Sequence, residues 1–224
     1  MINAFAGIPV SAILDGLLSY VCLVILLTFH EFAHAWTAAR CGDNTAKDQG
    51  RVSLNPIVHM EIVGTVVLPL LVIFLSLAQS SLANFIIGWG RPVPVNPYNL
   101  RHRRRDDTLI ALAGPAMNLA LAAVVMVIAR GFDLAGQGAM MEVAVRMAII
   151  SLVLCFFNLL PIPPLDGSHV LKNLVGMRDE TYVRLCQFGF LAVILAIQIP
   201  FVRGFIQSAT WVTMDTLARV VGLA

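Results

Sequence analysis

The sequence is poor in charged residues, which make up only 12% of its 224 residues, whereas 58% are hydrophobic. Soluble globular domains carry about 25% charged residues, so this chain has too few to cover a surface that faces water. Its apolar runs are long and are separated by short basic loops, as in helical proteins that cross a membrane several times. The mean hydropathy of +0.83 agrees with that class. The scarcity of charge therefore predicts an integral membrane protein whose surroundings are mainly the lipid bilayer.

Two further absences narrow the class. The 15 Lys and Arg nearly balance the 13 Asp and Glu, and a net charge of +2 is too small to predict nucleic acid as a partner. Cysteine pairs are also missing, since the four cysteines stand singly with no CxxC spacing, at Cys22, Cys41, Cys155 and Cys186. This pattern excludes a disulfide framework and a cysteine metal site.

The N-terminal apolar stretch lacks the marks of a cleaved signal peptide. No Lys or Arg precedes Arg40, and no A-x-A-like cleavage site follows the apolar run. A secretory signal has a basic start and such a site. We therefore expect a retained transmembrane helix over residues 11–39.

The hydrophobic segments predict an all-α polytopic membrane protein with about four to six transmembrane helices. Apolar segments lie at 11–39, 62–77, 82–89, 108–129, 143–160 and 186–201. Gly64 and Pro69 interrupt the second segment, so we expect it, alone or with 82–89, to form a re-entrant or hairpin segment near the active site. The helix ending near residue 160 is broken by PIPPLDG, which no continuous helix can contain.

The remaining stretches complete a single membrane-embedded domain over residues 1–224. We expect a catalytic core over about 11–175 and peripheral C-terminal helices over 186–224. The tail from 204 onward fits an interfacial helix as well as a span, because its Asp215 and Arg219 lie away from its apolar face. In the connection after the first helix, RVSLNP predicts a short strand that Pro56 ends.

Residues 30–34, HEFAH, form an HExxH motif on a predicted helix. The spacing places His30 and His34 on one face, one turn apart, where both imidazoles can bind one metal ion. Glu31 is then placed to accept a proton from a metal-bound water. Ionisable side chains at the end of a membrane helix are costly and mark functional sites, which favours a metal centre over a chance match.

A catalytic zinc site usually has three protein ligands, so one more ligand is needed. The remaining histidines are His59, His102 and His169. The most suggestive carboxylate is Asp166 in NLLPIPPLDGSH, because it follows an apolar helix and Gly167 permits a close backbone approach. An Asp-Gly turn leaving the membrane explains the same residues, and His169 is a rival ligand three residues further on.

Three motifs occur in a fixed order over about residues 20–175. HEFAH ends one membrane helix, AGPAMN at 113–118 opens another, and NLLPIPPLDG at 158–167 closes a third. In this combination the chain resembles the site-2 protease family of intramembrane zinc metalloproteases. NPIVH at 55–59 and GRPVPVNP at 90–97 are similar to the compact prokaryotic members without a PDZ domain.

The resemblance implies one Zn²⁺ per chain, held by His30, His34 and Asp166. It implies that Glu31 is the catalytic base, and it favours Asp166 over His169 as the third ligand. One departure from the family is Ser168, where many relatives have a second glycine.

Other motif residues are implied more loosely. Asn158 corresponds to a family asparagine that contacts the substrate backbone or the reacting carbonyl; its amide could donate to an oxyanion, and a cap at the helix break fits it as well. His59 fits a polar partner in the site or an interfacial histidine. Gly114, Pro115 and Asn118 match the family's GPxxN and are expected to serve close helix packing.

A shared metal ion constrains the topology. The helices at 11–39 and 143–160 must run parallel, with 108–129 antiparallel, so that both motif ends lie at one depth. The loops on the metal side hold most basic residues, including a topogenic loop around Arg101–Arg105, while the opposite side keeps little beyond Arg130, Arg146 and Arg203. The positive-inside rule then places the active site on the cytoplasmic side and the N-terminus outside. The resemblance to the compact prokaryotic members implies that the membrane is a prokaryotic inner membrane.

The sequence thus predicts a zinc metalloendopeptidase that hydrolyses peptide bonds in or near transmembrane segments of membrane proteins, as in regulated intramembrane proteolysis. A helical substrate must unwind first, and the proline-rich stretches could form an extended edge that pairs with it. A zinc transporter or channel is an alternative, but it needs a polar relay that 108–129 and 186–201 hardly offer. A catalytically silent membrane scaffold of the same fold is another, and the intact motifs argue against it. The sequence does not determine the oligomeric state.

Overall fold

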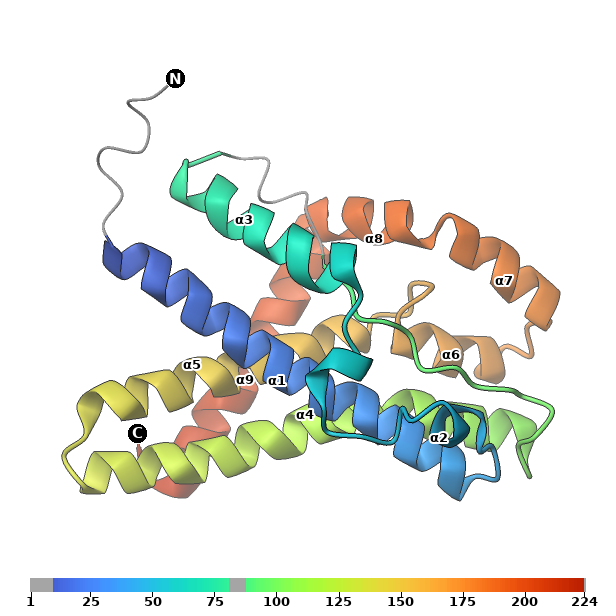
Figure 1. Cartoon of the computed structure of the whole chain (residues 1–224), viewed down its shortest axis with the longest axis horizontal. Helices are drawn as coiled ribbons and strands as arrows, with labels where there is room; N and C mark the ends of the chain where they lie inside the picture. The colour runs from blue at the N-terminus through green and yellow to red at the C-terminus, as the bar shows by residue number, and fades with distance from the viewer. Residues whose placement is uncertain (1–9, 81–87, 224) are drawn as a thin grey trace.

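The computed structural model describes residues 10–80 and 88–223, which are mainly helical (Figure 1). The helices are α1 (Val10–Arg40), α2 (Thr45–Asp48), η2 (Pro56–Val58), η3 (Ile62–Val67), α3 (Leu68–Leu77), α4 (Arg103–Leu134), α5 (Gly138–Asn158), α6 (Asp166–Leu174), α7 (Asp179–Gln187), α8 (Gly189–Gln198) and α9 (Pro200–Val221). By length and composition, α1, α4 and α5 can each cross a membrane. Helices α7 and α8 are joined at a bend of 64° and give a fourth candidate span if the bent pair is counted as one. This confirms the predicted all-α polytopic membrane fold.

Helix α4 packs against both other long helices. In Figure 1, α1 and α5 run from the side of the N-terminus toward α6, and α4 runs in the opposite direction. The α4–α5 contact buries small and flexible side chains, including Ala122, Met126, Ala148 and Leu152. Small residues let two helix backbones approach closely inside a membrane. The directions of the three helices, with α4 opposite to α1 and α5, are those that a metal site shared by α1 and the end of α5 requires.

The apolar segment that follows α1 turns back, so that the chain returns close to the point where this segment begins. It begins with the π-helical turn η3 and continues as α3, and together these residues 62–77 form a shorter apolar helix rather than a candidate span. The backbone N–H of Trp89 donates to the Gly64 carbonyl at 3.1 Å, so the chain comes back beside its starting point. A return to one depth supports a re-entrant or hairpin segment. Of the predicted apolar piece 82–89, residues 82–87 lie outside the described part of the chain.

The predicted short strand over RVSLNP was wrong. Residues 51–55 run through bends into the 3₁₀-helix η2. The Asn55 side chain accepts a hydrogen bond from Ile57 N at 3.1 Å, and Pro56 occupies the first helical position, where its missing N–H is not needed. A local cap therefore takes the place of strand pairing.

The predicted loop around Arg101–Arg105 was also partly wrong, because α4 begins at Arg103, ahead of the predicted start at 108. The Asp106 carboxylate accepts a hydrogen bond from His102 N at 2.7 Å. This satisfies one of the free N–H groups at a helix start and extends the helix over the arginines.

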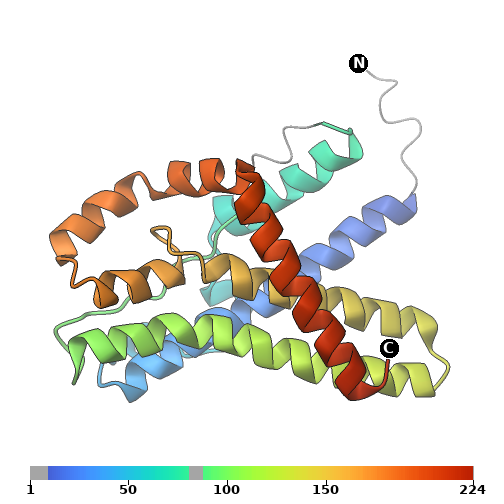
Figure 2. The same ribbon diagram turned by 180° about the vertical axis from the view of Figure 1, so that it is seen from behind.

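The C-terminal part forms three helices. The predicted helix 186–201 is divided at Phe188 between α7 and α8. The tail forms α9, which crosses α4 and α5 in Figure 2 and buries Ile206, Thr210 and Met214. Among the described helices, α9 is not one of the candidate membrane spans, in contrast to α1, α4 and α5.

Candidate metal centre

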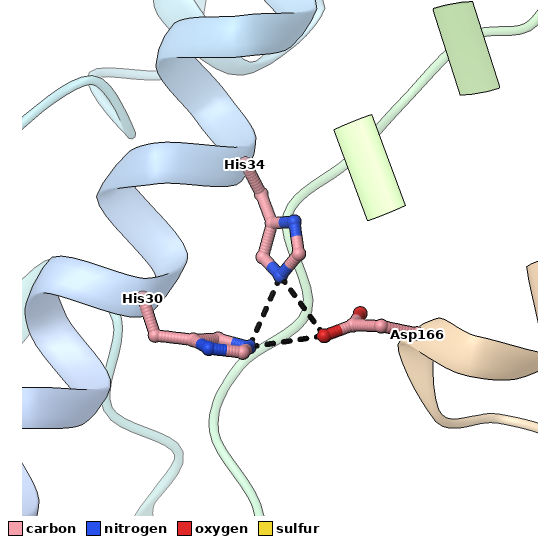
Figure 3. A group of neighbouring side chains, drawn as sticks. All are labelled: His30, His34 and Asp166. Atoms are coloured by element: carbon pink, nitrogen blue, oxygen red, sulfur yellow. Dashed lines mark hydrogen bonds and ion pairs between the residues drawn. The ribbon is translucent and has the colours of Figure 1, made fainter. Parts of the chain in front are cut away.

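Two histidines of α1 and one aspartate of α6 converge on one point (Figure 3). His30 and His34 lie on successive turns near the end of α1, and Asp166 is the first residue of α6. His30 Nε2 lies 3.0 Å from His34 Nε2 and 3.2 Å from Asp166 Oδ2, and His34 Nε2 lies 3.4 Å from the same oxygen. Within the described part of the chain, this is the one group found of three His, Cys, Asp or Glu side chains that could hold a metal ion.

The spacing of these three atoms fits a tetrahedral zinc ion. Zinc lies about 2.0–2.2 Å from nitrogen and oxygen ligands, so neighbouring ligand atoms are about 3.3–3.5 Å apart. The observed separations of 3.0, 3.2 and 3.4 Å are close to that value. Asp166 Oδ2 is buried and has no hydrogen-bond partner among the described residues beyond its approach to the two imidazoles. The donor set is one that zinc prefers, and it leaves a fourth position for water.

Asp166 reaches this point because the chain breaks after α5. Prolines prevent the helix from continuing, a cis peptide joins Pro163 to Pro164, and α6 starts at Asp166. A Cβ on Gly167 would lie 2.1 Å from the Leu159 carbonyl oxygen. No other residue than glycine fits there, which is the close backbone approach expected from the sequence.

Ser168, the departure from the family pattern, is buried beside this turn. Its hydroxyl donates to the Leu165 carbonyl at 2.6 Å and lies 2.8 Å from the Tyr182 hydroxyl on α7. The serine therefore ties the start of α6 to α7 and does not face the group of three ligands.

The α4 motif AGPAMN lies directly against the two histidines. A Cβ on Gly114 would lie 2.4 Å from His34 Nε2 and 2.5 Å from His30 Cε1. The Ile110 carbonyl accepts from His34 Nδ1 at 2.7 Å, and Asn118 Nδ2 lies 3.1 Å from His30 Nδ1. The sequence predicted only helix packing for this motif. The structure adds polar contacts that orient both rings, which the crossing of α1 and α4 creates and no single segment reveals.

Glu31 faces the returning chain beside the histidines. Its Oε1 would lie 3.4 Å from a Cβ on Gly90, and Leu27 would lie 3.2 Å from the same position. Glycine at this point therefore lets a backbone pass close to the Glu31 carboxylate.

The residues before and after Gly90 are anchored by hydrogen bonds. Arg91 N donates to the His59 carbonyl at 2.9 Å, and buried Arg51 donates to the Arg91 carbonyl through Nη2 at 2.5 Å. Trp89 N donates to the Gly64 carbonyl at 3.1 Å. These hydrogen bonds use the backbone groups of Trp89 and Arg91, and none between described residues uses the N–H or C=O of Gly90.

His59 is buried behind this segment. Its Nε2 donates to the Ser53 carbonyl at 2.7 Å, and its Nδ1 has no partner among the described residues. Burial lowers the pKa of His59, which favours the neutral ring. A neutral ring with its proton on Nε2 presents Nδ1 as an acceptor, so this arrangement fits a polar partner that anchors Arg91 better than a donor to an oxyanion.

His169 points away from the group of three ligands. Its Nδ1 lies 3.2 Å from Asp107 Oδ1 on α4, and Lys172 and Asn173 reach the same carboxylate at 3.3 and 2.8 Å. This buried network joins α6 to the start of α4. Asp107 could not be recognised from the sequence, because it stands in a charged run with no motif around it.

Asn158 is the last residue of α5 and is half-buried. Its Nδ2 donates to the Leu154 carbonyl at 3.0 Å, one turn back on its own helix. This contact fits the cap interpretation, and an amide that contacts a substrate would first have to leave this partner.

Comparison with known proteins shows the family of the chain. Residues 18–137 and 132–197 match the family described as peptidase family M50. The chain belongs to this family. The resemblance to the site-2 protease family and the choice of zinc are thereby confirmed.

The relatives extend over most of the chain. It is 34% identical over 192 residues to "Putative zinc metalloprotease YwhC" of Bacillus subtilis (strain 168), covering 80% of each chain. It is 31% identical over 208 residues to "Putative zinc metalloprotease Rip2" of Mycolicibacterium smegmatis, covering 87% of this chain and 75% of the relative. Rip2 of Mycobacterium tuberculosis (strain H37Rv) is 31% identical over 215 residues, covering 95% and 76%. No solved structure gave a significant match.

Proposed function

We propose that this chain is an intramembrane zinc metalloendopeptidase that hydrolyses peptide bonds in or near the transmembrane segments of other membrane proteins. The observation that carries the proposal is the convergence of His30, His34 and Asp166 at the end of an apolar helix, with Glu31 beside them. We assign one Zn²⁺ to these three residues and the role of catalytic base to Glu31.

The chemistry divides between the metal and one carboxylate. When bound, zinc lowers the pKa of a coordinated water to about 7 and so supplies a hydroxide nucleophile. Glu31, adjacent to His30, would accept a proton from the attacking water and return it to the leaving amine nitrogen. His30 and His34 are buried, so little bulk water reaches the two imidazoles.

The backbone at Gly90 supplies a place for the substrate. Gly90 lies beside Glu31, and its N–H and C=O groups have no hydrogen-bond partner in the described part of the chain, so an extended peptide can pair with them. Pairing in this way requires the substrate to leave its helical conformation, because a helix uses its carbonyls internally. Helix-stabilising substitutions around the scissile bond should slow cleavage, and unchanged cleavage rates would refute this part.

An apolar cavity adjoins that backbone. It has a volume of about 660 Å³, lies between α1, α3 and α5, and has Gly90 on its wall. Leu27, Ile73, Val153 and Phe157 are among its lining residues. Such walls suit the apolar side chains that flank a scissile bond in a transmembrane segment, and they hold no charge to recognise a soluble peptide.

We also propose that the chain lies in a prokaryotic inner membrane, with its active site toward the cytoplasm and its N-terminus outside. The basic residues of the connections after α1 and before α4 support this orientation under the positive-inside rule. The bacterial relatives support the location.

The experiment that tests the proposed function is the substitution Glu31→Gln. The purified variant should retain zinc and lose cleavage of a model transmembrane substrate, because an amide cannot accept the proton of the nucleophilic water. Glu142→Gln, at an exposed position on α5, is the matched control and should cleave as the wild type does. A Glu31→Gln variant that cleaves at the wild-type rate would contradict the proposal, and a zinc transporter would keep its flux in this variant.

A further inference from the structure

One face of α4 follows the metal-binding group closely. Ile110, Gly114 and Asn118 stand four residues apart and so lie on one side of the helix. The Ile110 carbonyl accepts a hydrogen bond from His34, and the Asn118 side-chain amide contacts His30. Gly114, which has no side chain, leaves room for both rings. The two polar contacts differ, because a backbone carbonyl can only accept a hydrogen bond, whereas an amide can donate or accept.

Asn118 is fully buried, with no exposed surface, and its contacts are incomplete. Its Nδ2 lies 3.1 Å from His30 Nδ1, while its Oδ1 has no partner among the described residues. A buried acceptor without a donor costs about 1–3 kcal/mol. Half a turn of the amide exchanges its oxygen and nitrogen between the same two positions, so either atom can face His30.

The tautomer of the neutral His30 ring determines which atom of the Asn118 amide must face it. A neutral imidazole carries one N–H, so a ring that offers the Nε2 lone pair to a metal carries its proton on Nδ1. That N–H needs an acceptor, and Asn118 is the side chain in reach. With the proton on Nε2, that nitrogen can instead donate to Asp166, 3.2 Å away, and Nδ1 accepts from the amide of Asn118.

We propose that Asn118 is a positioning residue for the metal centre, whose side-chain oxygen accepts a hydrogen bond from His30 Nδ1 when zinc is bound. The contact fixes the tautomer and the orientation of His30, as the Ile110 carbonyl does for His34. The proposal rests on the proposed function, since it takes His30 as a ligand. It gives the asparagine of the GPxxN motif a role that helix packing does not require.

Two substitutions separate an acceptor from a donor. Asn118→Asp keeps oxygen acceptors and, once ionised, has no donor, whereas Asn118→Leu has a similar size and neither. Zinc affinity, measured on the purified full chain by competition with a chromophoric chelator, should fall about 10- to 100-fold in the leucine variant. The aspartate variant should bind within a few-fold of the wild type. The absorption spectrum of the Co²⁺-loaded aspartate variant should match the wild type, and that of the leucine variant should not.

Ser151→Ala is the matched control. The Ser151 hydroxyl donates to the backbone carbonyl of Asn118 at 2.7 Å, so its loss removes a buried polar contact at the same residue without touching the amide. This variant should unfold at a lower temperature and bind zinc as the wild type does.

Each outcome has one meaning. An aspartate variant that binds zinc as weakly as the leucine variant shows that the amide donates, and a leucine variant with wild-type affinity shows that the contact is dispensable; either result overturns the proposal. If Asn118→Leu does not fold, the aspartate variant alone decides, because a tenfold loss of affinity there overturns the proposal. A wild-type chain that binds no zinc overturns the proposed function instead.

Discussion

At the scale of single residues, the two histidines pack against a position on α4 that has room for no side chain. Gly114 contributes no side chain, yet its Cα borders both imidazoles, since an added Cβ would overlap His34 and His30. The helical spacing of HEFAH predicted the pair of histidines correctly, because that spacing is local. The contact of Gly114 could not be predicted, since it depends on how closely α1 and α4 approach.

Gly114→Ala should weaken zinc binding. Overpacking a buried contact costs about 1–3 kcal/mol, which corresponds to roughly a 5- to 150-fold loss of affinity if the strain falls on the two imidazole rings. Gly131→Ala on the same helix is the control, because nothing lies within 4 Å of its added Cβ. Alanine there should stabilise the helix by about 0.5–1 kcal/mol and leave zinc affinity unchanged. Equal zinc affinities for the two variants would contradict this account of Gly114.

At the scale of elements, two short segments must be held in place around α1. Helix α6 carries Asp166 and is fixed to α4 through Asp107, and the segment 88–91 is fixed through Arg51, His59 and Gly64. The resemblance to a family indicated Asp166, but neither Asp107 nor Arg51 stands in a motif that reveals its partner. Arg51 and the Arg91 carbonyl are far apart in the sequence, so their contact depends on the tertiary fold and could not be predicted from a local pattern.

Asp107→Ala should release α6. Removing this carboxylate should cost about 1.5–3 kcal/mol, because His169 and Asn173 lose a charged acceptor, while Lys172 keeps Asp179 at 3.0 Å. Zinc affinity should fall together with the free energy of unfolding, as Asp166 loses its support. Asp215→Ala, which breaks an exposed i,i+4 pair with Arg219, should cost less than about 0.5 kcal/mol. Denaturant unfolding in detergent measures both, and a cost for Asp107→Ala no larger than that of the control would contradict the role of this network.

Gly64→Ala should displace the segment that pairs with the substrate. Its Cβ would lie 2.5 Å from the Trp89 carbonyl oxygen and 2.6 Å from the Trp89 ring. We expect KM for a transmembrane substrate to rise roughly tenfold, while zinc content stays at the wild-type level. Gly138→Ala, with nothing within 4 Å of its Cβ, should leave KM unchanged. A loss of zinc without a change in KM would show that Gly64 supports the metal centre instead.

At the scale of the whole molecule, hydropathy and motif order predicted most of the architecture. The three long helices and their directions follow from long apolar runs and from the need to bring two motifs to one depth. The strand at 51–56 and the loop at Arg103–Arg105 were mispredicted because caps at Asn55 and Asp106 are local contacts that hydropathy does not contain. The break between α7 and α8 and the packing of α9 likewise depend on tertiary contacts.

The proposed orientation predicts which connections face outside. In a variant without the four native cysteines, Gln137→Cys between α4 and α5 should react with a membrane-impermeant maleimide in intact cells. Gln49→Cys, in the connection after α1, should react only after permeabilisation, because that connection lies on the cytoplasmic side. Both residues are exposed, so their accessibility to the reagent differs only by the membrane. The reverse labelling pattern would contradict the orientation.

The most direct test of the metal assignment is the zinc content of the purified chain and of Asp166→Ala. The account predicts one zinc ion per wild-type chain and a large loss of bound zinc in Asp166→Ala, with cleavage abolished in that variant and in wild type treated with chelator. His169→Ala should retain its zinc, because that ring binds Asp107. An Asp166→Ala variant that keeps wild-type zinc affinity would contradict the claim that this carboxylate and the two histidines hold one ion.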